Sequence, residues 1–367
     1  MRPELYREGI RAQGYTRPPM DWPSILSQLT SKVDLDRAAA RAAMAEVMAG
    51  SATPAQVAAL IVAWRMKGET TEEMTGMVEA IREAAVPVPV DPNGLVDVVG
   101  TGGDRVGTGG DRVGTFNIST AAALVVAGAG AKVAKHGNRS MSSKCGSADV
   151  LEELGLVIDL PVESNLALLK ETNFAFFFAP LYHPAFRHAG PVRRELGIRT
   201  IFNFLGPLAN PAGALRQAIG VSDPQMAERM IGVLRELGSV HSFVFSGDGG
   251  VDEIVPTGPN FIYRLQDGEV THAEFTPEDF GVKRIELSAL AGVDAPENAR
   301  ILRSVLAGET GPRRDAGLVN AAPALVAAGL ASGFAEGVEL AGHSIDSGAS
   351  QEVLERTTSR SRDLALT

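Results

Sequence analysis

The feature that most constrains this chain is a change of sequence pattern near Leu95. Before Leu95, apolar residues recur at helical spacing, whereas after it short apolar runs alternate with helical stretches. The runs that we interpret as strands are LVDVVG (95–100), AKVAKHG (131–137), AIGV (218–221) and SVHSFVFSG (239–247). This alternation predicts an α/β fold with a mostly parallel central sheet, in which ligands bind at the loops that leave the carboxyl ends of strands.

Turn residues and composition divide the chain into parts. We expect an N-terminal arm over 1–20 and a small all-helical domain over 21–90, to which part of 190–215 is expected to contribute. A larger α/β domain is expected over 95–367. Its polar tail after Gly348 is expected to be peripheral.

Helix-start signals support the helical domain. Asp34 is expected to cap a helix that ends at Gly50. Thr53 and Thr70 each begin a capping box, in which Gln or Glu follows three residues later. These caps predict three successive helices before the prolines of 87–92.

Composition excludes several classes of protein. The net charge of −10 argues against a broad face that neutralises nucleic-acid phosphates. We find neither an apolar run long enough to span a membrane nor a secretory signal, so no membrane partner is expected. A single cysteine, Cys145, excludes an internal disulfide framework and favours a reducing compartment, so a cytoplasmic location is expected.

A glycine-rich loop follows the strand 95–100. Its unit TGGDRVG occupies 101–107 and is repeated without change at 108–114. Glycine permits close backbone approach to a phosphate, and Asn117 is well placed to cap the following helix, so the loop and the helix start can form an anion site. A plain turn is an equally good interpretation of the glycines alone.

The segment KHGNRSMSSKCGSAD (135–149) follows a strand and precedes a helix. It combines the cations Lys135, Arg139 and Lys144 with several serines, a set that suits phosphate oxygens or, equally, a solvated basic loop. His136, taken alone, is more typical of a hydrogen-bonded structural histidine than of a catalyst.

Two later stretches carry further charge. The adjacent carboxylates Asp252 and Glu253 can share Mg²⁺, which prefers hard oxygen ligands, or can form an exposed acidic turn. In the stretch 183–211, Arg193 or Arg194 can pair with a carboxylate through a bidentate fork, or can lie on an ordinary helix.

Taken in order, these motifs resemble the anthranilate phosphoribosyltransferases, which belong to the nucleoside phosphorylase and phosphoribosyltransferase fold family. The matching pieces are GTGGD…TFNIST, KHGNRSMSSKCGSADVLEELG, HPAFRHAGPVRRELGIRTIFNFLGPLANP and GDGGVDE. The resemblance implies a homodimer that transfers the phosphoribosyl group of phosphoribosyl pyrophosphate (PRPP) to the amine of anthranilate, in tryptophan biosynthesis.

The resemblance also implies site residues, position by position. The PRPP site would comprise Gly107, Gly110, Asp111, Thr115, Asn117, Ser119, Thr120, Lys135, Asn138, Arg139, Ser143 and Ser147. Anthranilate would meet Gly107, His136, Asn138, Arg193 and Pro207, with Arg193 at its carboxylate. Two Mg²⁺ ions would be held by Ser119, Asp252 and Glu253.

The implied reaction needs no covalent nucleophile, because pyrophosphate is a good leaving group. Lys135 and backbone N–H groups would stabilise its departing charge, Arg193 would orient anthranilate, and His136 is a candidate proton acceptor. These three side chains are the expected catalytic residues.

The chain departs from the family pattern in its two copies of GTGGD. The copy at 107–111 keeps the family spacing to Thr115, whereas the copy at 100–104 keeps the junction with the strand. Our hypothesis is that 107–114 forms the site and that 101–106 is extruded. Two alternatives remain: an impaired homologue that acts as a binding protein, and a pyrimidine nucleoside phosphorylase.

Overall fold

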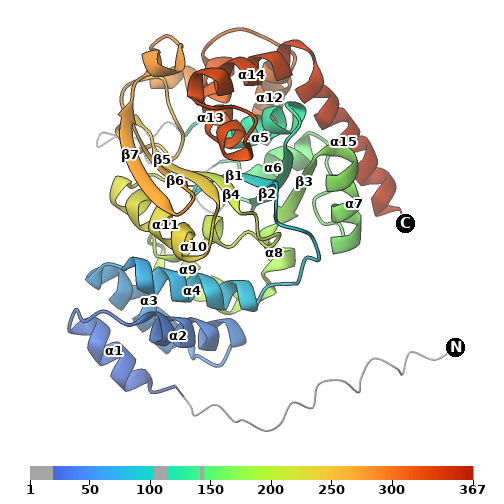
Figure 1. Cartoon of the computed structure of the whole chain (residues 1–367). Coiled ribbons are helices and arrows are strands. Elements are labelled where there is room, and N and C mark those ends of the chain that lie inside the picture. Colours follow the sequence, from blue (N-terminus) through green and yellow to red (C-terminus); the bar gives the residue numbers. More distant parts are fainter. Residues whose placement is uncertain (1–19, 103–113, 141–143, 367) are drawn as a thin grey trace, which may run out of the picture.

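The computed structural model describes residues 20–102, 114–140 and 144–366, which form a small helical unit and a larger α/β unit (Figure 1). The predicted fold class is confirmed. Within the described ranges, no helix is both long and apolar enough to cross a membrane.

The small unit is built on local helix signals. Its first helices are α1 (Trp22–Thr30), α2 (Arg37–Ala49), α3 (Pro54–Lys67) and α4 (Thr71–Glu83). The capping boxes that begin at Thr53 and Thr70 are both present. The predicted cap of α2 is wrong, because Asp36 accepts the N–H of Ala39 at 2.7 Å while Asp34 pairs with Lys67.

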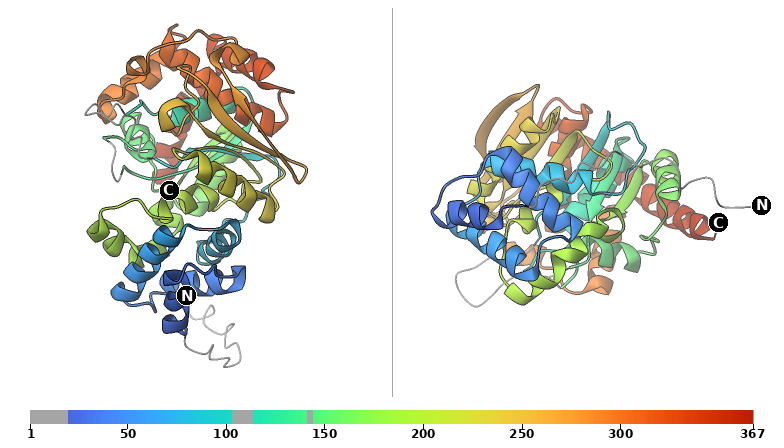
Figure 2. Two further views of the ribbon diagram at one scale, coloured as in Figure 1. Left: turned by 90° about the vertical axis from the view of Figure 1, so that its left-hand side faces the viewer. Right: turned by 90° about the horizontal axis from the view of Figure 1, so that it is seen from below.

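Two short helices from the middle of the chain pack on the helical unit: α9 (Gly190–Leu196) lies on α3, and α10 (Phe202–Leu208) lies on α4. A third, α8 (Ala179–Tyr182), packs against β3 (Phe174–Phe178). Val192 and Phe202 belong to the same hydrophobic core as Met44 and Trp64. Figure 2 shows these segments between α1–α4 and the sheet.

The larger unit contains a seven-stranded sheet in the order β3-β2-β1-β4-β5-β6-β7. The strands are β1 (Leu95–Gly100), β2 (Lys132–Gly137), β3 (Phe174–Phe178), β4 (Arg216–Gly220), β5 (His241–Ser246), β6 (Asn260–Gln266) and β7 (Glu269–Phe275). In this sheet order the first five strands, β3, β2, β1, β4 and β5, are parallel to one another. β6 pairs antiparallel with β5, and β7 pairs antiparallel with β6. The chain changes direction across the sheet at β1 and β4.

Both faces of the sheet are covered. One face packs on α5 (Ile118–Gly128), α6 (Ser147–Glu153), α12 (Ala295–Leu306), α13 (Pro312–Ala328) and α14 (Phe334–Asp346). The other packs on the helical unit and on α11 (Pro224–Glu236). Because side chains alternate along a strand, Val96 and Val98 face the first layer, and Asp97 faces the second with Val99.

The end of the chain corrects one expectation. Residues after Gly348 form α15 (Ala349–Ala365), which packs against α5 and α7 (Val162–Thr172). Val353 and Leu354 are buried in this contact. The polar tail is therefore part of the α/β unit and not a peripheral extension.

Candidate active site

Several of the predicted site residues lie at or near the carboxyl ends of the parallel strands. Gly100 ends β1 and Gly220 ends β4, at the point where the strand order reverses and where open α/β sheets bind ligands. The N–H of Thr101 donates to the carbonyl of Gly220 at 3.0 Å. A Cβ on Gly220 would lie 1.8 Å from the carbonyl oxygen of Asp252, so only glycine fits beside the acidic loop.

The adjacent carboxylates are buried and held by backbone N–H groups. Asp252 is 5% exposed and Glu253 is 7% exposed, so the alternative of an exposed acidic turn is wrong. Asp252 Oδ2 accepts the N–H of Gly102 at 2.6 Å, and Glu253 Oε1 accepts the N–H of Ser119 at 3.2 Å. Hard oxygen donors that are neighbours in a buried loop fit Mg²⁺.

The structure corrects part of the loop hypothesis. Thr101 and Gly102, which we expected to be extruded, lie against Asp252, and Arg199 donates to the carbonyl of Gly102 at 2.8 Å. At the other end of the loop, Thr115 forms a bridge with Ala291. The predicted residues Gly107, Gly110, Asp111 and Ser143 lie outside the described residues, as do the other residues between 103 and 113.

Asn117 stands at the start of α5 but does not cap it with its side chain. Its Nδ2 donates to the carbonyl of Cys145 at 3.3 Å, and its Oδ1 accepts from Asn298 at 2.9 Å. The predicted cap is therefore wrong. Asn117 instead joins the helix start to the segment before α6, while Thr120 is fully buried one residue beyond Ser119.

Lys135 is a buried cation in β2. Its Nζ donates to the carbonyl of Val98 on the neighbouring strand, and the side chain is 1% exposed. Burial lowers the pKa of Lys135 to about 8, although the charges of Asp97 and Glu253 act in the opposite direction. The structure therefore brings Lys135 close to Glu253, and at neutral pH this lysine carries a poorly solvated positive charge.

His136 is buried and neutral. Its Nδ1 lies 3.1 Å from the carbonyl of Gly206, which can only accept, so Nδ1 carries the proton and Nε2 keeps its lone pair. Nε2 is buried with no hydrogen-bond partner among the described residues. Burial, and then the neighbouring His183 ring 5.1 Å away, hold the pKa of His136 well below its ordinary value.

Asp97, which was not among the predicted site residues, organises this region. Asp97 is fully buried, and it accepts the N–H of His136 at 3.1 Å and the side-chain amide of Asn210 at 2.8 Å. Burial raises the pKa of Asp97 to about 6, against the lowering effects of Asn210 and Lys135. The available signal was a lone charged residue inside the buried strand LVDVVG.

The residues after β2 form the next part of the site. The carbonyl of Asn138 accepts from the Ser147 hydroxyl, at the first turn of α6, at 3.3 Å. Arg139 is half exposed and pairs with Glu152 and Asp149, and these bonds raise the pKa of its guanidinium. Its charge is therefore already balanced within the chain.

Arg193 lies on α9 in a partly apolar setting. Its guanidinium is 5.1 Å from the centre of the Phe202 ring, and burial lowers its pKa. The neighbouring Arg194 is exposed. Pro207 lies inside α10, and its carbonyl accepts from the side-chain amide of Gln217 at 3.1 Å.

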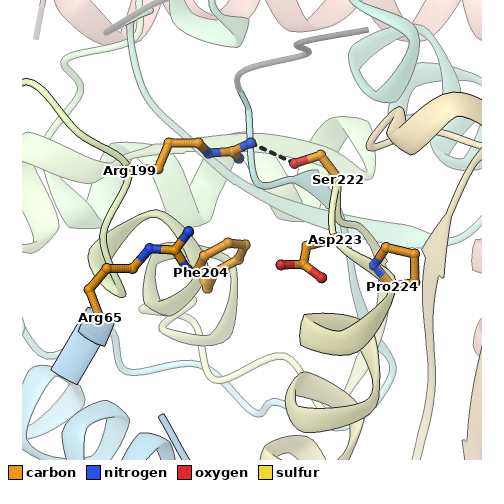
Figure 3. Close-up of a pocket in the computed structure, with 6 residues that line it drawn as sticks. All are labelled: Arg65, Arg199, Phe204, Ser222, Asp223 and Pro224. Carbon is orange, nitrogen blue, oxygen red and sulfur yellow. Dashed lines mark hydrogen bonds between the residues drawn. The ribbon is translucent and has the colours of Figure 1, made fainter. Parts of the chain in front are cut away.

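A pocket of about 240 Å³ lies beside this site, between the helical unit and the start of α11. Its lining residues are Arg65, Arg199, Phe204, Ser222, Asp223 and Pro224. In Figure 3 the two arginines approach from one side, and Arg199 reaches Ser222 across 2.7 Å. None of the six was predicted as a site residue, although Arg199 also contacts Gly102 at the loop.

Known proteins are similar to this chain in sequence and in fold. The a/b domain of the glycosyl transferase family matches residues 103–351 of this chain, and the helical bundle domain of that family matches residues 23–85. The anthranilate phosphoribosyltransferase of Chloroflexus aurantiacus is 49% identical over 92% of this chain and 98% of its own length. That of Moorella thermoacetica is 49% identical over 90% of this chain and 95% of its own.

Solved structures agree. The crystal structure of anthranilate phosphoribosyltransferase from Thermus thermophilus has a TM-score of 0.85 at 42% identity, over 92% of this chain and 99% of that one. The Saccharomyces cerevisiae enzyme in complex with PRPP and Mg has a TM-score of 0.84 at 27% identity, over 93% and 98%. The chain belongs to the glycosyl transferase family and, within it, to the anthranilate phosphoribosyltransferases.

Proposed function

We propose that this chain transfers the phosphoribosyl group of PRPP to the amine of anthranilate, which gives N-(5-phosphoribosyl)anthranilate and pyrophosphate in tryptophan biosynthesis. The observation that carries the proposal is the buried cation Lys135 close to Glu253, which with Asp252 forms a buried acidic pair beside the end of β1, in a member of this family. Related structures hold PRPP with Mg, and 4-fluoroanthranilate.

The PRPP site of the proposal follows the strand ends. Ser119, at the start of α5, and Lys135, in β2, come from the two elements that follow the glycine loop in the chain. Helix starts and lysine both favour phosphate oxygens. The full set is Gly107, Gly110, Asp111, Thr115, Asn117, Ser119, Thr120, Lys135, Asn138, Arg139, Ser143 and Ser147.

Mg²⁺ is the proposed cofactor, as two ions held by Ser119, Asp252 and Glu253. When bound, Mg²⁺ neutralises the charge of the pyrophosphate. The chain prepares this site in advance, because Gly102 and Ser119 each use a backbone N–H to fix one carboxylate. The remaining carboxylate oxygens then have a fixed direction.

Anthranilate is proposed to lie against Gly107, His136, Asn138, Arg193 and Pro207. Arg193 is the carboxylate partner, because its weakly solvated charge gains most from an anion. The Nε2 lone pair of His136 is the proton acceptor for the amine, since its Nδ1 proton is held by Gly206. The buried charge of Lys135 stabilises the departing pyrophosphate.

The same proposal includes a cytoplasmic homodimer. The comparisons do not favour the alternatives of a binding protein or a pyrimidine nucleoside phosphorylase. The relatives that match most of this chain are anthranilate phosphoribosyltransferases.

Loss of anthranilate fluorescence, with PRPP and Mg²⁺ present, tests the activity directly. We expect consumption that stops when EDTA removes the metal. Arg193→Ala is expected to raise the KM for anthranilate roughly tenfold or more, since a hydrogen-bonded charge pair is lost. Arg194→Ala is the matched control, because Arg194 is the next residue in the helix and its side chain is exposed. A folded wild-type protein that leaves anthranilate unconsumed would overturn the proposal.

A further inference from the structure

The last turn of α10 is held from three directions. The carbonyls of residues 206–208 each accept from a side chain of a different element. His136 of β2 contacts the first, and Gln217 of β4 donates to the second at 3.1 Å. Arg82 of α4 donates to the third, with Nε at 3.1 Å and a terminal nitrogen at 2.6 Å. This turn carries Pro207, which the proposed function places against anthranilate.

Arg82 is an unusual member of this set because it is a charge. Burial alone lowers the pKa of its guanidinium to about 10, and no carboxylate among the described residues acts on it. It therefore stays protonated at neutral pH. Its acceptor, Leu208, is the last residue of α10, where the helix dipole is negative and favours a cation.

The charge of Arg82 also acts on His183, whose ring neighbours that of His136. Burial lowers the pKa of His183 to about 4, and the charge of Arg82 adds to that lowering. The His183 ring is in turn 5.1 Å from the His136 ring. The guanidinium therefore holds the turn at 206–208 and lies near enough to His183 for its charge to act on that ring.

We propose that Arg82 is a positioning residue for the acceptor half of the reaction. By holding the carbonyl of Leu208 with two N–H groups, it fixes Gly206 and Pro207 against His136 and sets where the anthranilate ring and amine lie. The inference rests on the proposed function, which assigns these contacts to anthranilate.

The test compares Arg82→Met, Arg82→Lys and Arg216→Met by steady-state kinetics for each substrate. Arg216 is the matched control, because it donates at 2.6 Å to the carbonyl of Ala327 in the last turn of α13, away from the site. We expect Arg82→Met to raise the KM for anthranilate roughly tenfold, with the KM for PRPP within twofold. Arg82→Lys is expected to recover part of this loss, because it keeps the charge and one donor.

Hydrogen exchange supplies a second readout. The N–H of Ala209 bonds to the carbonyl of Gly206, so its exchange is expected to speed up in Arg82→Met and not in Arg216→Met. Equal KM changes for both substrates, or the same profile in Arg216→Met, would show a merely structural role and overturn the inference. An inactive wild type overturns the proposed function, whereas an active wild type with an unchanged Arg82→Met overturns only this inference.

Discussion

Burial of Lys135 disfavours the positive charge that its proposed role requires. The side chain is 1% exposed, and burial outweighs the two nearby carboxylates, so the pKa falls to about 8. A charge with few competing water molecules interacts more strongly with a phosphate. The same burial leaves the charge easy to lose in mild alkali.

Lys135→Gln is expected to lower kcat/KM for PRPP roughly 100-fold, the usual cost of losing one electrostatic group aimed at developing charge. In the wild type, kcat/KM should fall as the pH rises above about 8, because the free enzyme then loses the lysine proton. The variant should lack this alkaline fall. A pH–rate profile of both proteins checks it, and an alkaline fall that persists in the variant would assign the titration elsewhere.

Asp97 makes stability depend on pH in the opposite sense from a surface carboxylate. Its pKa is raised from 3.8 to about 6, so its contribution to stability is full below about pH 4 and is lost as the pH rises through 6. Asp97→Asn removes this titration. The free energy of unfolding of the wild type, relative to Asp97→Asn, should fall by about 1 kcal/mol between pH 5 and pH 6.5. Urea unfolding at each pH measures this, and parallel profiles would contradict it.

Among the elements, α3 and α4 are joined through one buried carboxylate. Glu73 has no exposed surface, and its Oε1 accepts from the backbone of Leu35 and the indole of Trp64. Its Oε2 accepts from Lys67 at 2.8 Å and from the N–H of Thr70 at 2.9 Å. The second capping box is therefore also the centre of the helical unit.

Glu73→Ala is expected to lower the free energy of unfolding by roughly 3–5 kcal/mol, because it leaves the buried Lys67 without its closest buried partner. Thr53→Ala, which removes only a cap, should cost about 1 kcal/mol. Chemical denaturation of both variants makes the comparison. Equal losses would mean that Glu73 acts as a helix cap and nothing more.

Local helix signals were predictable, and long-range choices were not. The capping boxes at Thr53 and Thr70 involve residues three positions apart, so sequence spacing was enough. Asp34 and Asp36 are both good caps, and the choice was decided by Lys67, which is distant in sequence. The side chain of Asn117 does not cap its helix because its oxygen accepts from Asn298, which is distant in sequence. The motifs pointed to the candidate site, but the buried hydrogen bonds around it depend on tertiary packing.

For the whole molecule, the candidate site lies where the two units meet. The strand ends supply the acidic loop and Lys135, and α10 supplies the turn at 206–208 (Figure 1). Between β1 and α5 runs the repeated loop, which is anchored at Thr101 by Gly220 and at Gly114 by Gly292. Because both anchors belong to the main fold, the extra unit adds length between fixed points.

Deletion of 101–107 or of 108–114 yields the same protein, because the units are identical. That single-unit chain is expected to fold and to stay active. Substitutions separate the copies, and we expect Asp111→Ala to lower kcat far more than Asp104→Ala, since Asp111 keeps the family spacing to Thr115. Kinetics of the three proteins checks this. A greater loss in Asp104→Ala would assign the phosphate contacts to the first copy.

The close approach of Asp252 to Gly220 also limits how this enzyme can change over generations. Any other residue at 220 puts an atom where the acidic loop already lies. The displaced loop would carry Asp252 and Glu253 with it, so a substitution there is expected to weaken the proposed metal site before it disturbs the sheet. The absence of a side chain at 220 therefore fixes how far the two proposed metal-binding carboxylates lie from the ends of the strands, although Gly220 itself has no proposed role in binding.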